Sequence, residues 1–537
     1  MSSRRSSFTV PSESPPSTTT SRSPFSRSSE NGPSEFDRRV TEAMAHWHVP
    51  GLAIAVVDNT HITAQGYGVT RLQPSGQAAA DVPLHDQVTP QTLFDCASMS
   101  KSFTAAAMAL LVQDEETMHV QWTTPVNRLL EDFVMETKAA TEQVTVEDIL
   151  CHRSGLPRHD DTLHGSTSPT PDTPLSITRN IRNLPLSAPL RTKYQYNNIL
   201  YTVASHAVES LSATPYACFL ATRFWEPLKM TRTFHDMSRI PRTERPFLSE
   251  RYDFNPAKQT YASFPHLSEP EGQGAGSIIS SVEDIARWLC AFIQRSGPLT
   301  PASYTDLRTP RILASDPDIP FHSPAFYALG WEVVYYHGHT LVRHDGMWAG
   351  HASSMLFIPS VQWGVVMMGN SESAEHVNTE VAWHLISDVL DVPREKRFDW
   401  RVHLEKTAAK TKDMLDKFML FPELRERLRQ SEVGVVPRLK RFVGVYENAG
   451  YRKIGFVWDV ELGALVADCS ERAFPFRIVV REHVADCCFV AEVVGVVMED
   501  AWPVRCQFDV GDGGKCERVG LALCDEYDGL IWFGRLD

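Results

Sequence analysis

The feature that most constrains this chain is a serine and a lysine three residues apart at the head of an apolar helix. Ser98 and Lys101 directly precede residues 103–112, which are rich in the strong helix formers Ala, Met and Leu. If Ser98 opens that helix, its hydroxyl and the Lys101 amine lie on one face within hydrogen-bond reach. The Ser98 N–H is then an unpaired donor at the positive end of the helix. The pattern predicts a nucleophile, a base and half of an oxyanion hole.

A capping serine followed by a solvated lysine is the structural alternative for the same four residues. About one S-x-x-K match is expected by chance in a chain with this much serine. The chain contains no second match, so the choice between the two interpretations depends on the other motifs.

Length and charge limit the classes of function. The 537 residues suffice for more than one domain with a sizeable core. The net charge of −14 and the pI of about 5.8 argue against nucleic acid as a partner. The longest apolar run, near residues 105–112, is much shorter than the roughly 18 residues of a membrane span, so no membrane partner is expected.

The chain divides into four segments by composition. Residues 1–33 are rich in Ser, Pro, Thr and Arg and are predicted to be disordered. They lack the apolar stretch of a secretory signal, so a cytoplasmic location is expected, with an organellar transit peptide as the alternative. Residues 34–395 combine helical and β patterns and predict an α+β domain with an antiparallel sheet. Residues 396–435 form a charged, partly helical linker, and residues 436–537 predict a small all-β domain.

Two further features bear on the chemistry of these domains. Residues 159–189 form a long polar stretch, and a loop of that length is typical of a lid, a binding loop or a disordered segment. The ten cysteines form no C-x-x-C, and no histidine pair has metal spacing, so neither a metal nor a cofactor is predicted. Buried thiols are the default interpretation, and a disulfide set or a redox role is the alternative.

Two short motifs could complete a site around Ser98. Tyr196 and Asn198 form a Y-x-N at the start of a predicted helix, and supply a phenol and an amide. A second Y-x-N, at residues 446–448, lies in the β-domain and leads into no helix. At the end of a predicted strand, His344 and Gly346 face one side and Asp345 the other, and the glycine allows close approach of a bound carbonyl. Neither G-x-S-x-G nor H-E-x-x-H occurs in the chain.

In the order S-x-x-K, Y-x-N, H-x-G, the three motifs resemble those of the serine β-lactamase and penicillin-binding-protein-like hydrolases. Within that family, the class C, esterase and D-aminopeptidase types are the most similar. The resemblance covers about residues 36–392, and the β-domain is similar to the barrel-like modules appended to some members. The matching stretches are residues 94–101, 151–157, 196–198, 276–288 and 327–331.

The resemblance implies a helical lobe set against an antiparallel sheet built from both ends of the domain, which is the β-lactamase/transpeptidase-like fold. It implies acylation of Ser98, followed by attack of water or another acceptor. Tyr196 and Lys101 would transfer protons, and Asn198 would hold the substrate amide. The backbone N–H groups of Ser98 and Met347 would form the oxyanion hole.

The chain departs from the β-lactamase pattern at His344, where those enzymes carry lysine. A neutral histidine can only hydrogen-bond a substrate carboxylate, and His344 is expected to titrate near neutrality. An esterase, amidase or D-amino-acid peptidase acting on a small molecule or peptide therefore fits better than a β-lactamase. Acyl transfer to a bound alcohol or amine is the first alternative, and a non-catalytic scaffold or sensor is the second. The acyl group, the acceptor and the oligomeric state do not follow from the sequence.

Overall fold

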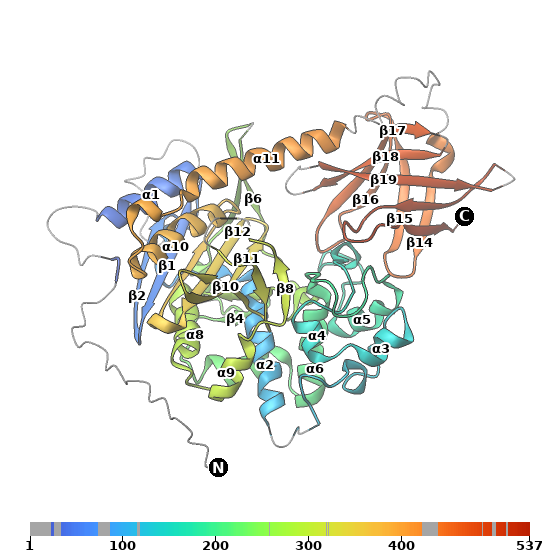
Figure 1. Ribbon diagram of the computed structural model, residues 1–537. Coiled ribbons are helices and arrows are strands. Elements are labelled where there is room, and N and C mark those ends of the chain that lie inside the picture. The colour runs from blue at the N-terminus through green and yellow to red at the C-terminus, as the bar shows by residue number, and fades with distance from the viewer. Residues whose placement is uncertain are drawn as a thin grey trace, which may run out of the picture.

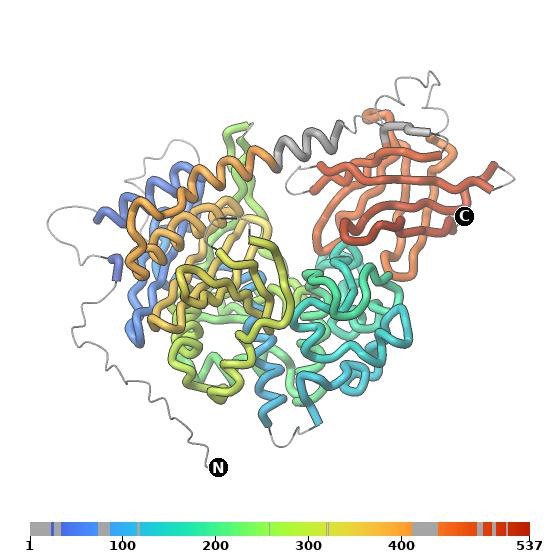
Figure 2. The backbone as a smooth tube through the Cα atoms, viewed as in Figure 1, coloured from blue at the N-terminus to red at the C-terminus, as the bar shows by residue number. Residues whose placement is uncertain are grey.

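The computed structural model describes residues 23–25, 34–72, 86–114, 117, 119–256, 258–317, 319, 322–420, 439–485, 487–496, 501–511 and 514–536, and Figure 2 draws the others in grey. Most of the segment predicted to be disordered, and residues 421–435 of the predicted linker, lie outside the described residues.

An eight-stranded antiparallel sheet forms the centre of the first domain (Figure 1), in the order β2-β1-β13-β12-β11-β10-β9-β8. Residues 52–58 of strand β1 pair with β13, so strands from the two ends of the domain lie side by side as the second and third strands of the sheet. The resemblance implied this closure, and the structure confirms it. The strands are β1 (Gly51–Asp58), β2 (His61–Gly68), β8 (Ile312–Ser315), β9 (Ala325–Tyr327), β10 (Glu332–Tyr336), β11 (His339–Trp348), β12 (His351–Ile358) and β13 (Trp363–Gly369).

Both faces of this sheet are covered by helices. Helices α1 (Glu35–His46) and α10 (Ala374–Val389) pack on one face, and α2 (Ser100–Gln113) and α8 (Val282–Gln294) pack on the other. Alternate residues of β1 enter the two cores, as the two-residue period of a strand requires. The remaining helices are α3 (Lys138–Gln143), α4 (Val146–Leu150), α5 (Pro174–Asn180), α6 (Asn198–Ser212), α7 (Tyr216–Leu220) and α9 (Pro301–Leu307).

Short strands complete the first domain. Strands β3 (Phe94–Asp95), β4 (Phe234–His235) and β7 (Ile278–Ser280) form a small sheet beside the start of α2, and β5 (Arg251–Asn255) pairs with β6 (Thr260–Phe264). Helix α11 (Trp400–Leu420) follows α10 in the chain, contacts it and runs toward the second domain (Figure 1). Among the described residues, no helix combines the length and the apolar character of a membrane span.

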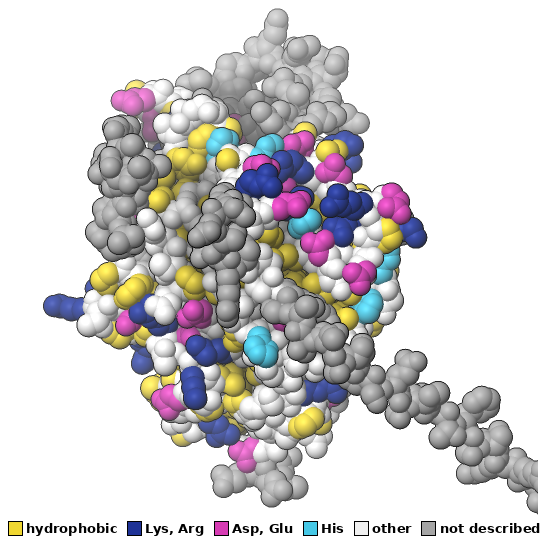
Figure 3. Space-filling view, turned by 90° about the vertical axis from the view of Figure 1, so that its left-hand side faces the viewer, with side chains coloured by type: hydrophobic (Ala, Val, Ile, Leu, Met, Phe, Trp, Pro, Cys, Tyr) yellow, Lys and Arg dark blue, Asp and Glu magenta, His cyan; other side chains and the backbone are white. Residues whose placement is uncertain are grey.

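Charged side chains of both signs lie next to one another on the face of the molecule shown in Figure 3. Two of the ion pairs on α10 are Arg401 with Glu380 at 2.6 Å and Arg397 with Asp388 at 2.6 Å. Interspersed charges of this kind are typical of a solvated surface.

The structure corrects three details of the sequence interpretation. Ser98 lies in a 3₁₀ turn (Ala97–Met99), and α2 begins only at Ser100. His344 lies within β11 rather than at its end, because the pairing with β12 continues to Trp348. The long polar stretch contains α5 and two 3₁₀ turns, and α5 begins with a capping box at Thr173, which the loop prediction missed.

The second domain is a closed barrel of eight antiparallel strands. Its interior is filled by aromatic rings: Phe442, Tyr446, Phe456, Phe489, Phe508 and Phe533 are all buried. The ten cysteines of the chain are free thiols, and six of them are buried. The strands are β14 (Gly444–Asn448), β15 (Arg452–Asp459), β16 (Ala464–Cys469), β17 (Phe476–Ala485), β18 (Cys488–Gly495), β19 (Ala501–Val510), β20 (Cys516–Leu521) and β21 (Ile531–Arg535).

The barrel rests on the segment that follows residues 151–157 (Figure 1). The backbone N–H of Gly165 donates to the carbonyl of Glu471 at 3.1 Å, and that of Ala473 donates to Leu163 at 2.9 Å. The ring nitrogen Nδ1 of His159 lies 2.6 Å from the Tyr451 hydroxyl. These two backbone hydrogen bonds and the His159–Tyr451 contact join the barrel to the first domain.

Candidate active site

Ser98 and Lys101 are in contact, as the S-x-x-K spacing predicts. Lys101 Nζ lies 3.0 Å from Ser98 Oγ, 2.7 Å from Asn198 Oδ1 and 2.9 Å from the Ala275 carbonyl oxygen. The amide and carbonyl oxygens can only accept, so they take two N–H donors from Lys101. In the neutral amine this leaves the nitrogen lone pair facing the Ser98 hydroxyl.

Burial favours that neutral amine. Lys101 is fully buried, and the loss of hydration lowers its pKa well below the ordinary value. The positive charge of Arg158 lowers the pKa further, while the charge of Asp160 opposes the shift. A deprotonated lysine next to a serine hydroxyl can act as a general base.

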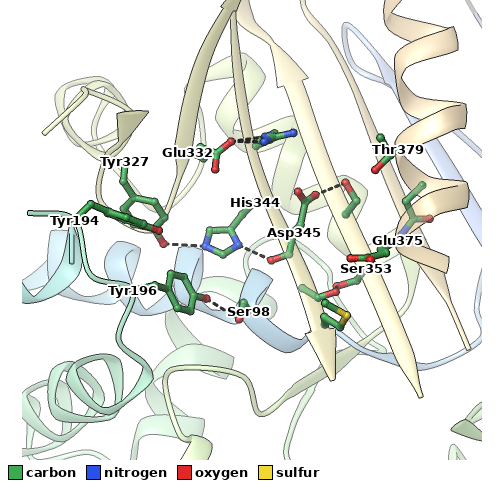
Figure 4. Close-up of a pocket in the computed structure, with 15 residues that line it drawn as sticks. Ser98, Tyr194, Tyr196, Tyr327, Glu332, His344, Asp345, Ser353, Glu375 and Thr379 are labelled. Atoms are coloured by element: carbon green, nitrogen blue, oxygen red, sulfur yellow. Dashed lines mark hydrogen bonds and ion pairs between the residues drawn. The ribbon is translucent and has the colours of Figure 1, made fainter. Parts of the chain in front are cut away.

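Tyr196 lies on the other side of the nucleophile. Its hydroxyl donates to Ser98 Oγ at 2.8 Å, as Figure 4 shows. Burial raises the pKa of Tyr196, so the phenol holds its proton at neutral pH. His152 fixes this segment, because its carbonyl accepts from the N–H of Gln195 at 2.8 Å and its Nδ1 accepts from the N–H of Asn197 at 3.1 Å.

Asn198 connects Lys101 to an ion pair between buried Asp160 and exposed Arg158. The amide nitrogen of Asn198 donates to Asp160 Oδ2 at 2.8 Å, and Arg158 Nε donates to the same oxygen at 2.5 Å. Because the Asn198 oxygen accepts from Lys101, both ends of this amide are bonded within the protein. Asn198 therefore fixes the lysine, and its expected contact with a substrate amide stays a prediction.

The backbone at Gly346 closes the site opposite Tyr196. A Cβ atom at Gly346 would lie 3.0 Å from the Ser98 nitrogen and only 2.3 Å from the Cys96 carbonyl oxygen. Only glycine permits this approach of β11 to the turn that carries Ser98. The next residue, Met347, has its side chain 49% exposed at the rim. The N–H groups of Ser98 and Met347 thus lie near one another on two rigid elements.

His344 faces the same side as Gly346, as the strand alternation predicts, and both are buried. Its Nδ1 lies 2.7 Å from the Asp345 carbonyl oxygen, an obligate acceptor, so Nδ1 carries the proton. Its Nε2 then accepts from the Tyr327 hydroxyl at 2.8 Å. Burial and the charge of Lys101 lower the pKa of His344 to about 4, which corrects the expectation that it titrates near neutrality.

These groups open into a cleft of about 290 Å³. Ser98, Tyr196, Tyr327 and Gly346 are among the residues that line it. The acidic side chains of Glu332 on β10, Asp345 on β11 and Glu375 on α10 line it as well (Figure 4). Within the described part of the chain, no group of three or more His, Cys, Asp or Glu side chains is arranged to hold a metal ion.

The structure brings all the residues expected from the sequence into one site. They are Ser98, Lys101, Tyr196, Asn198, His344, Gly346 and Met347. Sequence reasoning missed three contributors: Arg158, Asp160 and Tyr327. The sequence did contain a hint of each one. Tyr327 is the first residue of the matching stretch 327–331, and Arg158 and Asp160 lie within three residues of the end of the stretch 151–157.

Comparisons with known proteins agree with this geometry. The family model described as Beta-lactamase matches residues 36–388. Unguisins hydrolase ungD' of Aspergillus campestris is 33% identical over 503 residues, covering 91% of this chain and 89% of the relative. Unguisins hydrolase ungD of Aspergillus violaceofuscus is 31% identical over 513 residues, covering 91% and 87%. The octameric penicillin-binding protein homologue from Pyrococcus abyssi has a similar fold, with a TM-score of 0.56 and 20% identity over 93% of this chain and 99% of that one.

Proposed function

This chain belongs to the β-lactamase family of serine hydrolases, and we propose that it cleaves an amide or ester bond through an acyl-enzyme on Ser98. The observation that carries the proposal is the environment of Lys101, whose two acceptor partners direct its lone pair to the Ser98 hydroxyl. A solvated lysine, the structural alternative, would be neither buried nor bonded in this way.

In the first half of the reaction, neutral Lys101 accepts the proton of Ser98. The serine oxygen attacks the carbonyl carbon, and the resulting oxyanion accepts hydrogen bonds from the N–H groups of Ser98 and Met347. One such donor typically contributes about 10²–10³-fold to the rate. The two donors belong to elements that approach one another closely at Gly346.

Collapse of the tetrahedral intermediate expels the leaving group. Tyr196 donates its phenolic proton to the leaving nitrogen or oxygen, and protonated Lys101 returns a proton to the Tyr196 phenolate. General acid catalysis of this kind typically contributes about 10²–10⁴-fold. Water then attacks the acyl-enzyme by the same steps in reverse, which releases the acid and regenerates Ser98. An amine leaving group needs a proton donor, and the raised pKa of Tyr196 keeps one available.

The substrate is proposed to be chemically similar to unguisins, and its scissile bond is proposed to be an amide. Two relatives named as unguisins hydrolases align with 91% of this chain, a span that includes both domains. The neutral imidazole at His344 cannot form an ion pair with a substrate carboxylate, which disfavours β-lactams.

Labelling with a fluorophosphonate and peptide mass analysis test the nucleophile. Ser98 is expected to carry the label in wild type, and Ser98→Ala is expected to carry none. Incubation with purified unguisins is expected to give products heavier by one water. Added alcohols and amines test the acyltransferase alternative, because acyl transfer would yield new esters or amides in place of the acid. An unlabelled Ser98 in correctly folded protein would overturn the proposal.

A further inference from the structure

A second cavity, of about 510 Å³, lies between the first domain and the rim of the barrel. The segment of Arg158, Asp160 and Asp161 forms one wall, and barrel residues between 474 and 526 form the other. Tyr196 lines this cavity and also lines the cleft that contains Ser98. The two cavities therefore meet at the group proposed to protonate the leaving group.

Acidic side chains dominate the wall of the second cavity. Asp160 and Asp161 come from the first domain, and Asp525 and Glu526 come from the barrel. Arg158 is the single basic side chain among the described residues that line it, and its Nε is bonded to Asp160. Burial and the charge of Asp160 raise the pKa of Asp161 to about 7, so its charge is incomplete at neutral pH. The other three carboxylates still outnumber the single guanidinium and give the cavity an excess of negative charge.

One of these carboxylates lacks a partner on one side. Asp160 is only 7% exposed, and its Oδ2 accepts from both Asn198 and Arg158. Its Oδ1 is buried and has no hydrogen-bond partner within the described residues. A buried carboxylate oxygen without a donor leaves negative charge uncompensated, and this charge lies behind the wall of the cavity.

Aromatic rings complete the wall. Phe474 and Trp502 of the barrel line the cavity together with Tyr196. Phe474 packs edge-on against Trp348 of β11, with 5.0 Å between ring centroids. The barrel rim therefore also contacts β11, the strand that carries His344 and Gly346. Aromatic faces attract organic cations, most strongly where water is excluded.

The cavity is fixed by direct bonds between the two domains. The N–H of Arg158 donates to Glu526 Oε2 at 3.4 Å, and Cys524 Sγ donates to the carbonyl oxygen of Arg158 at 3.3 Å. The segment that carries Asp160 therefore has a barrel residue on one side and Asn198 of the catalytic network on the other.

We propose that this cavity is a subsite for a positively charged group on the leaving-group portion of the substrate, an organic ammonium held by the acidic and aromatic side chains on both domains. This inference rests on the proposed function, since Tyr196 defines which side of the scissile bond faces the barrel. It assigns the barrel a role in substrate selection.

A matched pair of esters tests the subsite in turnover. Acetylcholine and 3,3-dimethylbutyl acetate share the acyl group and the shape of the alcohol, and differ in the ammonium charge. Full-length wild type is expected to prefer acetylcholine by about tenfold in kcat/KM. The double variant D525N/E526Q and the variant Trp502→Ala are expected to lose most of this preference while still hydrolysing the neutral ester. Asp528→Asn is the control, because this exposed acid lies on the same barrel loop but does not line the cavity.

Calorimetry with phenethylammonium, phenethyl alcohol and 3-phenylpropionate tests binding without turnover. The ammonium is expected to bind about tenfold more tightly than the alcohol to full-length protein, and the carboxylate more weakly still. Equal binding of the three probes, or tightest binding of the carboxylate, would overturn the subsite. If Ser98 takes the fluorophosphonate but neither assay shows a charge preference, the proposed function stands and the subsite is wrong. If the ammonium binds but Ser98 takes no label, the proposed function is wrong. The assignment of this cavity to the leaving-group portion of the substrate is then wrong as well.

Discussion

The two domains of this chain bury different kinds of side chains. The first domain encloses the amine of Lys101, the imidazole of His344 and the carboxylate of Asp160. The barrel encloses stacked and edge-on aromatic rings, such as Phe442 and Phe508 with 4.0 Å between their centroids. The first interior is polar where it meets Ser98. The second is mainly aromatic, and its buried Tyr446 hydroxyl donates to the carbonyl oxygen of Phe442 at 2.9 Å.

The difference shows where the chain accepts a cost in stability. Burying an amine or a carboxylate is unfavourable unless each is hydrogen-bonded, and the Lys101 and Asn198 network provides those bonds. Buried groups with shifted pKa values concentrate at functional sites. The barrel interior contains no comparable network among its described residues, and its chemistry lies at the rim, where it meets Arg158 and Tyr196.

Removing the nucleophile or the base is the largest perturbation of the polar interior. Ser98→Ala and Lys101→Ala are each expected to lower kcat/KM by about 10⁴-fold or more, because the remaining site offers no equivalent group. Steady-state kinetics on the best ester or amide substrate measures the loss, and circular dichroism checks that both variants fold. Ser360→Ala, an exposed serine on the same domain, is the control. Activity of Ser98→Ala within about tenfold of wild type would exclude Ser98 as the nucleophile.

Cavity formation is the corresponding perturbation of the apolar interior. Phe508→Ala is expected to lower the free energy of unfolding by about 3–5 kcal/mol, because it deletes a fully packed ring. The rate of Ser98 labelling is expected to stay close to that of wild type at temperatures where the barrel remains folded. Denaturant unfolding and timed labelling measure the two effects. Val457→Ala, exposed on the same barrel, is the stability control, and a labelling rate that falls in step with stability would show that the barrel core supports the chemistry.

A methyl group at Gly346 tests the contact between β11 and the nucleophile turn. Gly346→Ala would place Cβ 2.3 Å from the Cys96 carbonyl oxygen, so β11 must move away from Ser98. Displacing the oxyanion donors is expected to lower kcat by about 10²–10³-fold, with a smaller effect on KM. Gly455→Ala in the barrel is the control, since a Cβ there meets nothing within 4 Å. Unchanged kcat in Gly346→Ala would show that this strand does not form the oxyanion hole.

A permanent charge at His344 is expected to have a smaller effect. Because the pKa of His344 is lowered to about 4, wild type holds it neutral above that pH, and its preference between anionic and neutral substrates is expected to be flat from about pH 5.5 to 9. Protonation, and with it any gain for anions, is expected only as the pH falls toward about 4.

His344→Lys is expected to raise kcat/KM for anionic substrates about fivefold relative to neutral esters. A pH series on nitrocefin and a neutral ester measures the ratio in both proteins. His339→Lys adds the same charge at the other end of β11 and is the control. A ratio that titrates near pH 6.5 in wild type would contradict the lowered pKa.

Metal removal is expected to have no effect on activity. The described residues hold no group of side chains arranged for a metal ion, and the proposed steps use only protein groups. Assays before and after dialysis against EDTA test this expectation. Loss of activity that zinc restores would reveal a metal site.

The three short motifs could be predicted from the sequence because the geometry of each one depends only on neighbouring residues. A three-residue spacing places Ser98 and Lys101 on one helical turn, and strand alternation places His344 and Gly346 on one face. The capping residue Asn197 and the helix after it position Tyr196 and Asn198 together. Even here the predicted start of the helix, Ser98, was two residues too early, because α2 begins at Ser100. Ala97 has a left-handed φ of 45°, which the local sequence does not predict.

Tertiary structure decided the environment of those motifs. Asp160 and Asn198 are 38 residues apart, and their contact requires the long polar segment to fold back beside α6. Arg158 and Glu526 are 368 residues apart, and no periodicity in either segment indicates that they meet. The lowered pKa values of Lys101 and His344 likewise depend on burial by segments distant in the chain.

The sequence by itself therefore determined which residues can react, because the spacing that brings reactive side chains onto one face is set within a single helix or strand. The protonation states of those residues, the support of Asn198 by Asp160 and the cavity beside Tyr196 came only from tertiary structure. The physical reason is that burial and charge pairing depend on how remote segments pack, and short-range propensities carry no information on that packing.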